Sequence, residues 1–460
     1  MAVALPLRRS MPALALAFLA AALGILCGIE PIYGLAAALG AAFVLVLLVD
    51  LYAGLIIFIL VVSLSEAPGF LGGDVTLSKL LGGLLLATWL AHLAMRRGAG
   101  ESFFGSRHPA ATWLLAALLA WVAITGVWAP APAASIDGAF RLFLSLTLFL
   151  IAFTAVHTRS QVIGLIAAII AGACLDAAIG LTTANDVADA ARLAGGQTSP
   201  GELAAVLAAG LVLSLGLARV MRGNQLAQLA ALGAGGLCLL GVFMTGSRAG
   251  LIAVAVALVA FIAVGGRWRG RALIISAAVV ALTYSFFAYA ATPEIRERVT
   301  TVGSGSGRVD LWTVGWRMVE DEPLKGIGYG NYPTSASDYV LEPGAVARGR
   351  YVIDQAKVAH NMYLQQWAET GLIGLVLFLA ILAFCLSSSL RAGREFARAG
   401  DQAMEMLCRV VFAATFAVLA GAFFGSNQFE KDLWLVLALG PVLLSVAGSR
   451  RALGAVHGRT

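Results

Sequence analysis

The decisive stretch of this sequence, 293–371, contains GSGSGRVDLWTVGW (303–316), GIGYGN (326–331) and AHNMYLQQWAETG (359–371). It is the only long stretch that is neither strongly apolar nor a short connector. Almost every other part of the chain belongs to a run of apolar residues. Any chemistry that this protein performs is therefore expected within this interval or next to it.

The composition is typical of a protein embedded in a membrane. The 460 residues are 60% hydrophobic and only 12% charged, and ordinary soluble proteins do not have this balance. Apolar runs of about 17–25 residues recur, which is the length that a helix needs to cross a bilayer. We therefore expect an all-α polytopic membrane protein with about 12–14 transmembrane helices, surrounded by membrane lipids. The net charge of +6 comes mostly from connectors and does not indicate a nucleic-acid partner.

The arginines of the connectors predict an orientation. With the N-terminus in the cytoplasm, connectors such as those holding Arg159, Arg267 and Arg391 all fall on the cytoplasmic side, as the positive-inside rule requires. The same orientation places the polar loop outside, in the periplasm of a Gram-negative cell with the protein in its inner membrane. The predicted organisation is one membrane domain, with N-terminal transmembrane helices over 1–292, a periplasmic loop with catalytic residues over 293–360, and C-terminal transmembrane helices over 361–460.

Four arginines lie on the predicted outer side, at or near the ends of apolar runs, where the rule would deplete them. A guanidinium group is planar and permanently charged, and it suits phosphate or diphosphate oxygens. The alternative is that these side chains only extend to the interface to keep their charge in water. The four residues are Arg141, Arg192, Arg248 and Arg308.

Two of these arginines have surroundings that favour an anion. Arg248 lies between Gly-Ser and Ala-Gly, small residues that let a ligand approach the backbone. Arg308 follows a Gly/Ser run and opens a predicted helix, where free N–H groups favour negative charge. Trp312 and Trp316 are one helical turn apart, so this helix is expected to lie at the membrane interface. A tight turn and a purely structural interfacial helix are the competing interpretations.

His360 lies at the membrane-proximal end of the loop. A neutral imidazole there could accept a proton from a sugar hydroxyl, although a single histidine also fits a structural role. If a helix runs unbroken from His360, Tyr363 shares its face. Glu369 is then about half a turn out of phase and does not contact His360 unless the helix is broken. The GIGYGN segment is predicted to be a turn and not a nucleotide loop, because no parallel β unit surrounds it.

In their order along the chain, these motifs resemble the O-antigen ligase/polymerase superfamily of bacterial membrane glycosyltransferases. The resemblance covers about residues 200–440. The motifs that carry it are Gly246-Ser247-Arg248, Ser306-Gly307-Arg308 with Trp312, Pro323-Leu324-Lys325-Gly326-Ile327-Gly328, His360-Asn361-Met362-Tyr363-Leu364 and Glu369-Thr370-Gly371.

The resemblance implies a GT-C-like membrane fold and the transfer of a glycan from an undecaprenyl-diphosphate donor. The acceptor would be a lipid A-core or another glycan, and no nucleotide sugar, metal or other cofactor is expected. Arg248 and Arg308 would hold the donor diphosphate, and His360 would activate the acceptor hydroxyl. Further candidates for substrate binding are Arg192, Arg141, Trp312, Tyr363 and Glu369.

The leading hypothesis is an O-antigen ligase-like glycosyltransferase that inverts the anomeric configuration. A polymerase of the same superfamily is the nearest alternative, with a carrier-linked repeat unit as its acceptor. A protein O-glycosyltransferase is less favoured, because no large extra C-terminal domain is present. A lipid-linked oligosaccharide flippase or other transporter is also possible, but transporters usually place charged residues in the middle of their spans. The sequence does not indicate an oligomeric state.

Overall fold

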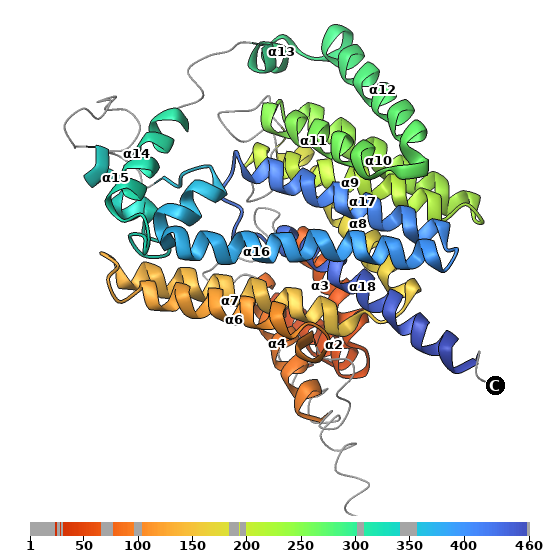
Figure 1. Ribbon diagram of the computed structural model, residues 1–460, viewed down its shortest axis with the longest axis horizontal. Helices are drawn as coiled ribbons and strands as arrows, with labels where there is room; N and C mark the ends of the chain where they lie inside the picture. Colours follow the sequence, from red (N-terminus) through yellow and green to blue (C-terminus); the bar gives the residue numbers. More distant parts are fainter. Residues whose placement is uncertain are drawn as a thin grey trace, which may run out of the picture.

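The described part of the protein consists almost entirely of helices (Figure 1). The computed structural model describes residues 24, 28, 31–65, 77–95, 104–183, 193, 199–300, 308–340 and 357–457, and no strand occurs among them. The first part of the chain forms α2 (Pro31–Val49), α3 (Leu51–Ser65), α4 (Leu77–Met95), α5 (Phe104–Arg107), α6 (Pro109–Thr125), α7 (Pro132–Ala155) and α8 (Arg159–Thr183).

The second part continues with helices that surround or precede the polar loop. They are α9 (Pro200–Val220), α10 (Gln225–Met244), α11 (Arg248–Val264), η1 (Gly266–Trp268), α12 (Arg269–Ser285), η2 (Phe286–Ala290), α13 (Pro293–Thr300), α14 (Arg308–Asp321), α15 (Tyr332–Val340), α16 (Met362–Arg398), α17 (Gln402–Ala422) and α18 (Lys431–His457).

The helices confirm the predicted class of an all-α polytopic membrane protein. Within the described residues, 8 helical segments are long and apolar enough to cross a membrane: α7, α8, α9, α10, the segment from η1 to η2, α16, α17 and α18. Five shorter apolar stretches, of 10–17 residues, lie in α2, α3, α4, α6 and α11. The first long apolar run of the sequence, 11–29, is also predicted to cross the membrane, but it lies almost wholly outside the described residues. The number of crossings therefore stays a prediction.

α9 lies at the centre of the bundle and packs against α8, α10, α11 and α17. Small residues allow the close approach of α9 and α17. A Cβ atom on Gly421 of α17 would lie 2.2 Å from the Ala205 Cβ, and one on Gly216 of α9 would lie 2.8 Å from Val410. Membrane helices commonly pack in this way, because small residues let the backbones come together. The beginning of α9 is thereby held firmly beside the end of α17.

α16 is broken near its beginning, and the break accommodates the turn at 323–328. Gly371 has φ 65° and ψ −174° inside the helix, a conformation that favours glycine. A Cβ atom there would lie 2.1 Å from the Leu324 carbonyl oxygen. The Leu372 N–H donates to the Pro323 carbonyl at 2.9 Å, and the Ile327 N–H donates to the Ala368 carbonyl at 2.9 Å. Of the two cases considered for the helix after His360, unbroken or broken, the structure has the broken one.

The two ends of the bundle differ in their charged groups. α9 has Glu202 in its first turn and Arg219 in its last turn, about 25 Å apart at 1.5 Å per residue. The connectors predicted to be cytoplasmic meet at the Arg219 end, where Arg159 pairs with Asp401 at 3.0 Å. α14 and α15 lie at the other end, beside the beginning of α16 (Figure 1). The predicted grouping of arginines thus fits the fold, while the orientation in the membrane stays a prediction.

Candidate functional site

Arg248 is the first residue of α11, at a tight corner after α10. Gly246 has φ 56°, and the Ser247 N–H donates to Thr245 Oγ1 at 3.2 Å. Ser247 then caps α11, because its Oγ accepts from the Gly250 N–H at 3.3 Å. The corner packs against α9, since a Cβ atom on Gly250 would lie 2.4 Å from the Ala204 Cβ. Arg248 is therefore half-buried at a helix N-terminus.

Arg308 is the first residue of α14, so the helix that it was predicted to open is confirmed. The Tyr332 hydroxyl donates to the Leu311 carbonyl and ties α14 to α15. Trp312 packs its ring against Phe423 and Phe424, with ring centroids 5.6 Å and 6.4 Å apart. The phenylalanines follow the end of α17, so these contacts fix the beginning of α14 against the membrane bundle.

His360 has a strained backbone directly before α16. In the described part of the chain it is the one non-glycine residue with a positive φ, at 49°. This conformation costs a residue with a side chain about 1–2 kcal/mol, and such strain concentrates at functional sites. The neighbouring residues hold it in place: Ala359 is buried, and Asn361 Oδ1 accepts from the Tyr363 and Leu364 N–H groups, both at 3.1 Å.

Electrostatic effects link these three candidates through Arg308. Burial lowers the pKa of the Arg308 guanidinium, and the charge of Arg248 lowers it further, while Glu202 opposes the change. Burial also lowers the pKa of the His360 imidazole; Arg308 and Lys357 add to this effect, and Glu202 opposes it. Charges influence one another in this way only over short distances. Four elements, α9, α11, α14 and the segment before α16, therefore contribute to one charged cluster.

Glu202 was missed by the sequence analysis. It occupies the third position of α9, and it forms a capping box in which Ser199 Oγ accepts from its N–H while its carboxylate accepts from the Ser199 N–H at 3.0 Å. The S-x-x-E pattern of Ser199 to Glu202 could have revealed the helix start. Its approach to His360 and Arg308 could not be foreseen, because it depends on how α9 packs against the other helices.

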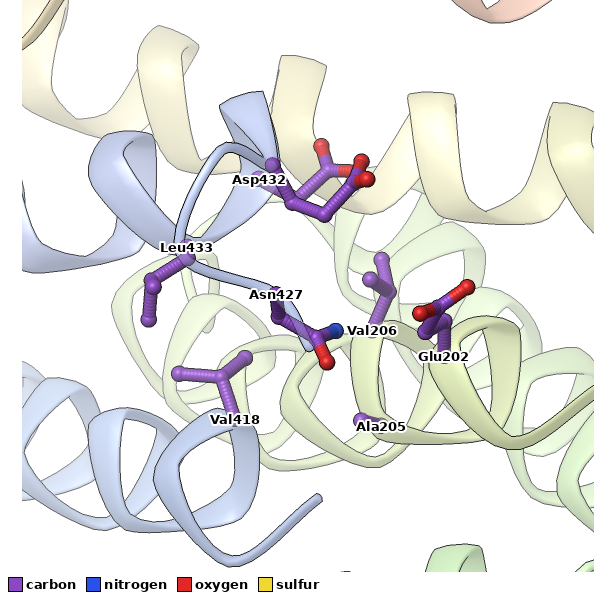
Figure 2. A pocket seen from close by; sticks show the side chains of 8 residues that line it. Glu202, Ala205, Val206, Val418, Asn427, Asp432 and Leu433 are labelled. Atoms are coloured by element: carbon purple, nitrogen blue, oxygen red, sulfur yellow. The ribbon is translucent and has the colours of Figure 1, made fainter. Parts of the chain in front are cut away.

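A small cavity adjoins Glu202 on the side of α18 (Figure 2). Figure 2 shows the Glu202 and Asp432 carboxylates and the Asn427 amide around it; Glu430 also lines it. The cavity volume is about 20 Å³, enough for about one water molecule. Asn427 is 7% exposed, and its Oδ1 has no hydrogen-bond partner within the described residues. Asn427 and Glu430 belong to the polar loop 425–430 between α17 and α18, which the sequence analysis also missed.

The same loop contacts the residues that follow His360. The Ser426 hydroxyl donates to Gln365 Oε1 at 2.6 Å, and the Ala359 N–H donates to the same oxygen at 3.4 Å. The loop thus lies between the Glu202 cavity and the beginning of α16. Its polar residues separate two apolar runs, which is the only signal that the sequence contains.

Glu369 and Tyr363 are engaged inside the protein. Glu369 is fully buried, and its Oε1 accepts from the Tyr332 N–H at 3.1 Å and from Gln365 Nε2 at 3.0 Å. The Tyr363 hydroxyl donates to the Leu419 carbonyl at 2.9 Å, and its ring lies 6.3 Å from that of Phe423. Both residues support the site from within, and their direct contact with substrate stays a prediction.

The other two arginines are not seen in the cluster. Arg141 is on α7, where its side chain is 61% exposed and pairs with Asp137 at 2.8 Å. Arg192 lies outside the described residues. Its neighbour Leu193 is buried, and the Leu193 N–H donates to the Met244 carbonyl at 3.1 Å, near the corner that holds Arg248. A substrate-binding role for either arginine stays a prediction.

The fold and the cluster define a class of protein: a polytopic helical membrane protein with paired guanidinium groups and an imidazole at one end of its bundle. Within the described residues, no three His, Cys, Asp or Glu side chains are grouped to hold a metal ion. Residues 233–379 match the family model described as O-antigen ligase, so this segment of the chain is similar to that family. The family is one of glycosyltransferase-like enzymes. No curated protein matches the chain.

The matched segment contains most of the candidate residues. Arg248, Arg308 and His360 lie inside it, as do Trp312, Tyr363 and Glu369. Glu202 and the loop around Asn427 lie outside it. The family match therefore supports the resemblance seen in the motifs, while the contribution of α9 and of the 425–430 loop comes from the structure.

Proposed function

We propose that the protein is an O-antigen ligase-like glycosyltransferase that transfers a glycan from undecaprenyl diphosphate to a lipid-core acceptor on the periplasmic side of the inner membrane. The observation that carries this proposal is the cluster of Arg248, Arg308 and His360 with Glu202 at one end of the helical bundle. Cationic groups for a diphosphate and an imidazole for a hydroxyl are the two elements that such a transfer needs.

Arg248 and Arg308 are assigned to the donor diphosphate. Each is the first residue of a helix, so backbone N–H groups and the helix dipole favour an anion at the same place. A guanidinium also forms paired hydrogen bonds with phosphate oxygens. As the bond between the anomeric carbon and the diphosphate breaks, both arginines stabilise the charge that develops on the leaving group. The proposal therefore invokes no metal or other cofactor.

His360 is assigned to the acceptor. Because its pKa is lowered by burial and by Arg308, the imidazole is neutral at neutral pH and ready to accept a proton. The acceptor hydroxyl oxygen attacks the anomeric carbon, its proton passes to His360, and undecaprenyl diphosphate leaves. A single displacement of this kind inverts the anomeric configuration.

Deletion of the gene in the source organism tests this function. A ligase deletion should leave long polymer on its lipid carrier and leave the lipid core undecorated, and wild-type plasmid should restore decorated core. Gel profiles of the lipopolysaccharide distinguish this result from two others. Cores capped by one repeat unit would indicate the polymerase alternative, and an unchanged profile would contradict both.

A further inference from the structure

Three arginines from three helical elements surround one indole ring at the end of the bundle opposite the candidate site. Their guanidinium carbons lie 5.3 Å (Arg219), 5.4 Å (Arg267) and 4.9 Å (Arg271) from the centroid of the Trp268 ring. Arg219 ends α9, Arg267 and Trp268 belong to η1, and Arg271 is in the first turn of α12. Cations attracted to one ring in this way repel one another, so the arrangement needs negative charge to balance it.

The protein supplies little of that charge. Glu405 on α17 pairs with Arg267, and it also accepts from Arg409 Nη2 at 2.8 Å. Arg409 is further bonded to the Val264 carbonyl at the end of α11. Two guanidinium groups, those of Arg267 and Arg409, thus share the Glu405 carboxylate, which is 3% exposed. Among the described residues, no ion pair reaches Arg219 or Arg271.

Buried donors in the cluster also lack an acceptor. Trp268 is 5% exposed, and its Nε1–H has no hydrogen-bond partner within the described residues. The same holds for Nε of Arg219 in that part of the chain. Leaving a buried donor without a hydrogen-bond partner costs free energy. If the arginines only extended toward water, the buried indole N–H would still have no partner, so that alternative does not explain it. Both features indicate a missing acceptor with negative charge.

We propose that this cluster binds the phosphate of an anionic glycerophospholipid. A phosphate offers several acceptor oxygens, which suit guanidinium groups and an indole N–H together. The cluster lies where membrane-spanning helices begin and end, and basic pockets of this kind bind lipid head groups. Only 11% of the α12 span is buried, and Leu273 and Ile274, directly after Arg271, are 52% and 71% exposed. Acyl chains would cover these side chains.

This site is separate from the proposed glycan transfer and does not depend on it. The bound phosphate would connect the end of α9 with the beginning of α12. α12 otherwise has few buried residues, Ala272 and Val279 being the buried ones in it. The lipid would therefore stabilise the position of α12 against the bundle.

Native mass spectrometry of the purified full-length protein tests the proposal. The probes are phosphatidylglycerol and phosphatidylcholine with identical acyl chains, and inorganic phosphate. The wild type should bind phosphatidylglycerol in preference to phosphatidylcholine. Arg271→Gln should weaken phosphatidylglycerol binding about fivefold, the effect of one basic side chain near an anionic head group. Trp268→Phe, which keeps the ring but removes the N–H, should weaken it as well.

Two controls carry the same chemical changes elsewhere. Arg398→Gln removes an arginine that pairs with Glu395 at the end of α16 and is 66% exposed, and Trp113→Phe alters an indole that is 76% exposed. Neither should affect lipid binding. Equal losses in Arg271→Gln and Arg398→Gln would show that general charge, and not this cluster, holds the lipid. Displacement of the lipid by millimolar inorganic phosphate would show a site for free phosphate instead. Either result would overturn the proposal.

Discussion

Replacing His360 with alanine is expected to reduce glycan transfer by about 10²–10⁴-fold, the usual contribution of a general base. The imidazole is half-buried beside Arg308, and an alanine side chain has no group that can accept the hydroxyl proton. The structural role of the residue is small, because the helix cap is formed by Asn361. Transfer should be measured in membranes that contain matched amounts of wild-type and variant protein.

His157→Ala is the matched control for this substitution. His157 is exposed just after α7, and its replacement should leave transfer unchanged. Wild-type rates for the His360→Ala variant, at normal protein levels, would remove His360 from the mechanism. A loss of the protein from the membrane would instead indicate a folding role; His360→Gly then serves as a second variant, since glycine adopts the positive φ at this position without strain.

The second large effect is expected for Arg308→Lys, with a loss of transfer of about 10²-fold. A lysine retains the positive charge but loses the planar pair of donors that a diphosphate engages, and removal of one donor from a transition-state site has an effect of this size. Arg308→Gln should be at least as harmful, because it loses the charge as well. The measurement is the initial rate of transfer at saturating acceptor.

Arg298→Lys is the control, since Arg298 is an exposed residue of the preceding helix α13. It should transfer at the wild-type rate. Full activity of Arg308→Lys would mean that charge alone suffices and that paired hydrogen bonding to the diphosphate is not needed. Full activity of Arg308→Gln would exclude Arg308 from the donor site.

The helical membrane class could be predicted from the sequence because each apolar run is by itself long enough to cross a bilayer as a helix. The sequence also predicted α14 and the turn at 326–331, since both depend on residues that are neighbours in the chain. The break in α16 was not predicted. Gly371 adopts its conformation because the Leu324 carbonyl approaches it, and that contact joins segments that are far apart in sequence.

The candidate site was predicted only in part for the same reason. Arg248, Arg308 and His360 each stand in a recognisable motif, and the structure brings them together. Glu202 carries no such motif beyond a helix cap, and its influence on His360 arises from the packing of α9. The complete burial of Glu369 by the docking of the 323–332 segment could not be predicted either.

The pH dependence of transfer by the wild type, Glu202→Gln and Lys357→Gln tests the central claim most directly, namely that a neutral His360 in this charged cluster accepts the proton. Because its pKa is lowered, wild-type activity should persist below a pH of about 6.5, the ordinary pKa of histidine, and should fall at lower pH. Glu202 raises this pKa and Lys357 lowers it. The acid limb should therefore move to lower pH in Glu202→Gln and to higher pH in Lys357→Gln. Identical acid limbs in all three proteins, or shifts in the same direction, would contradict the account.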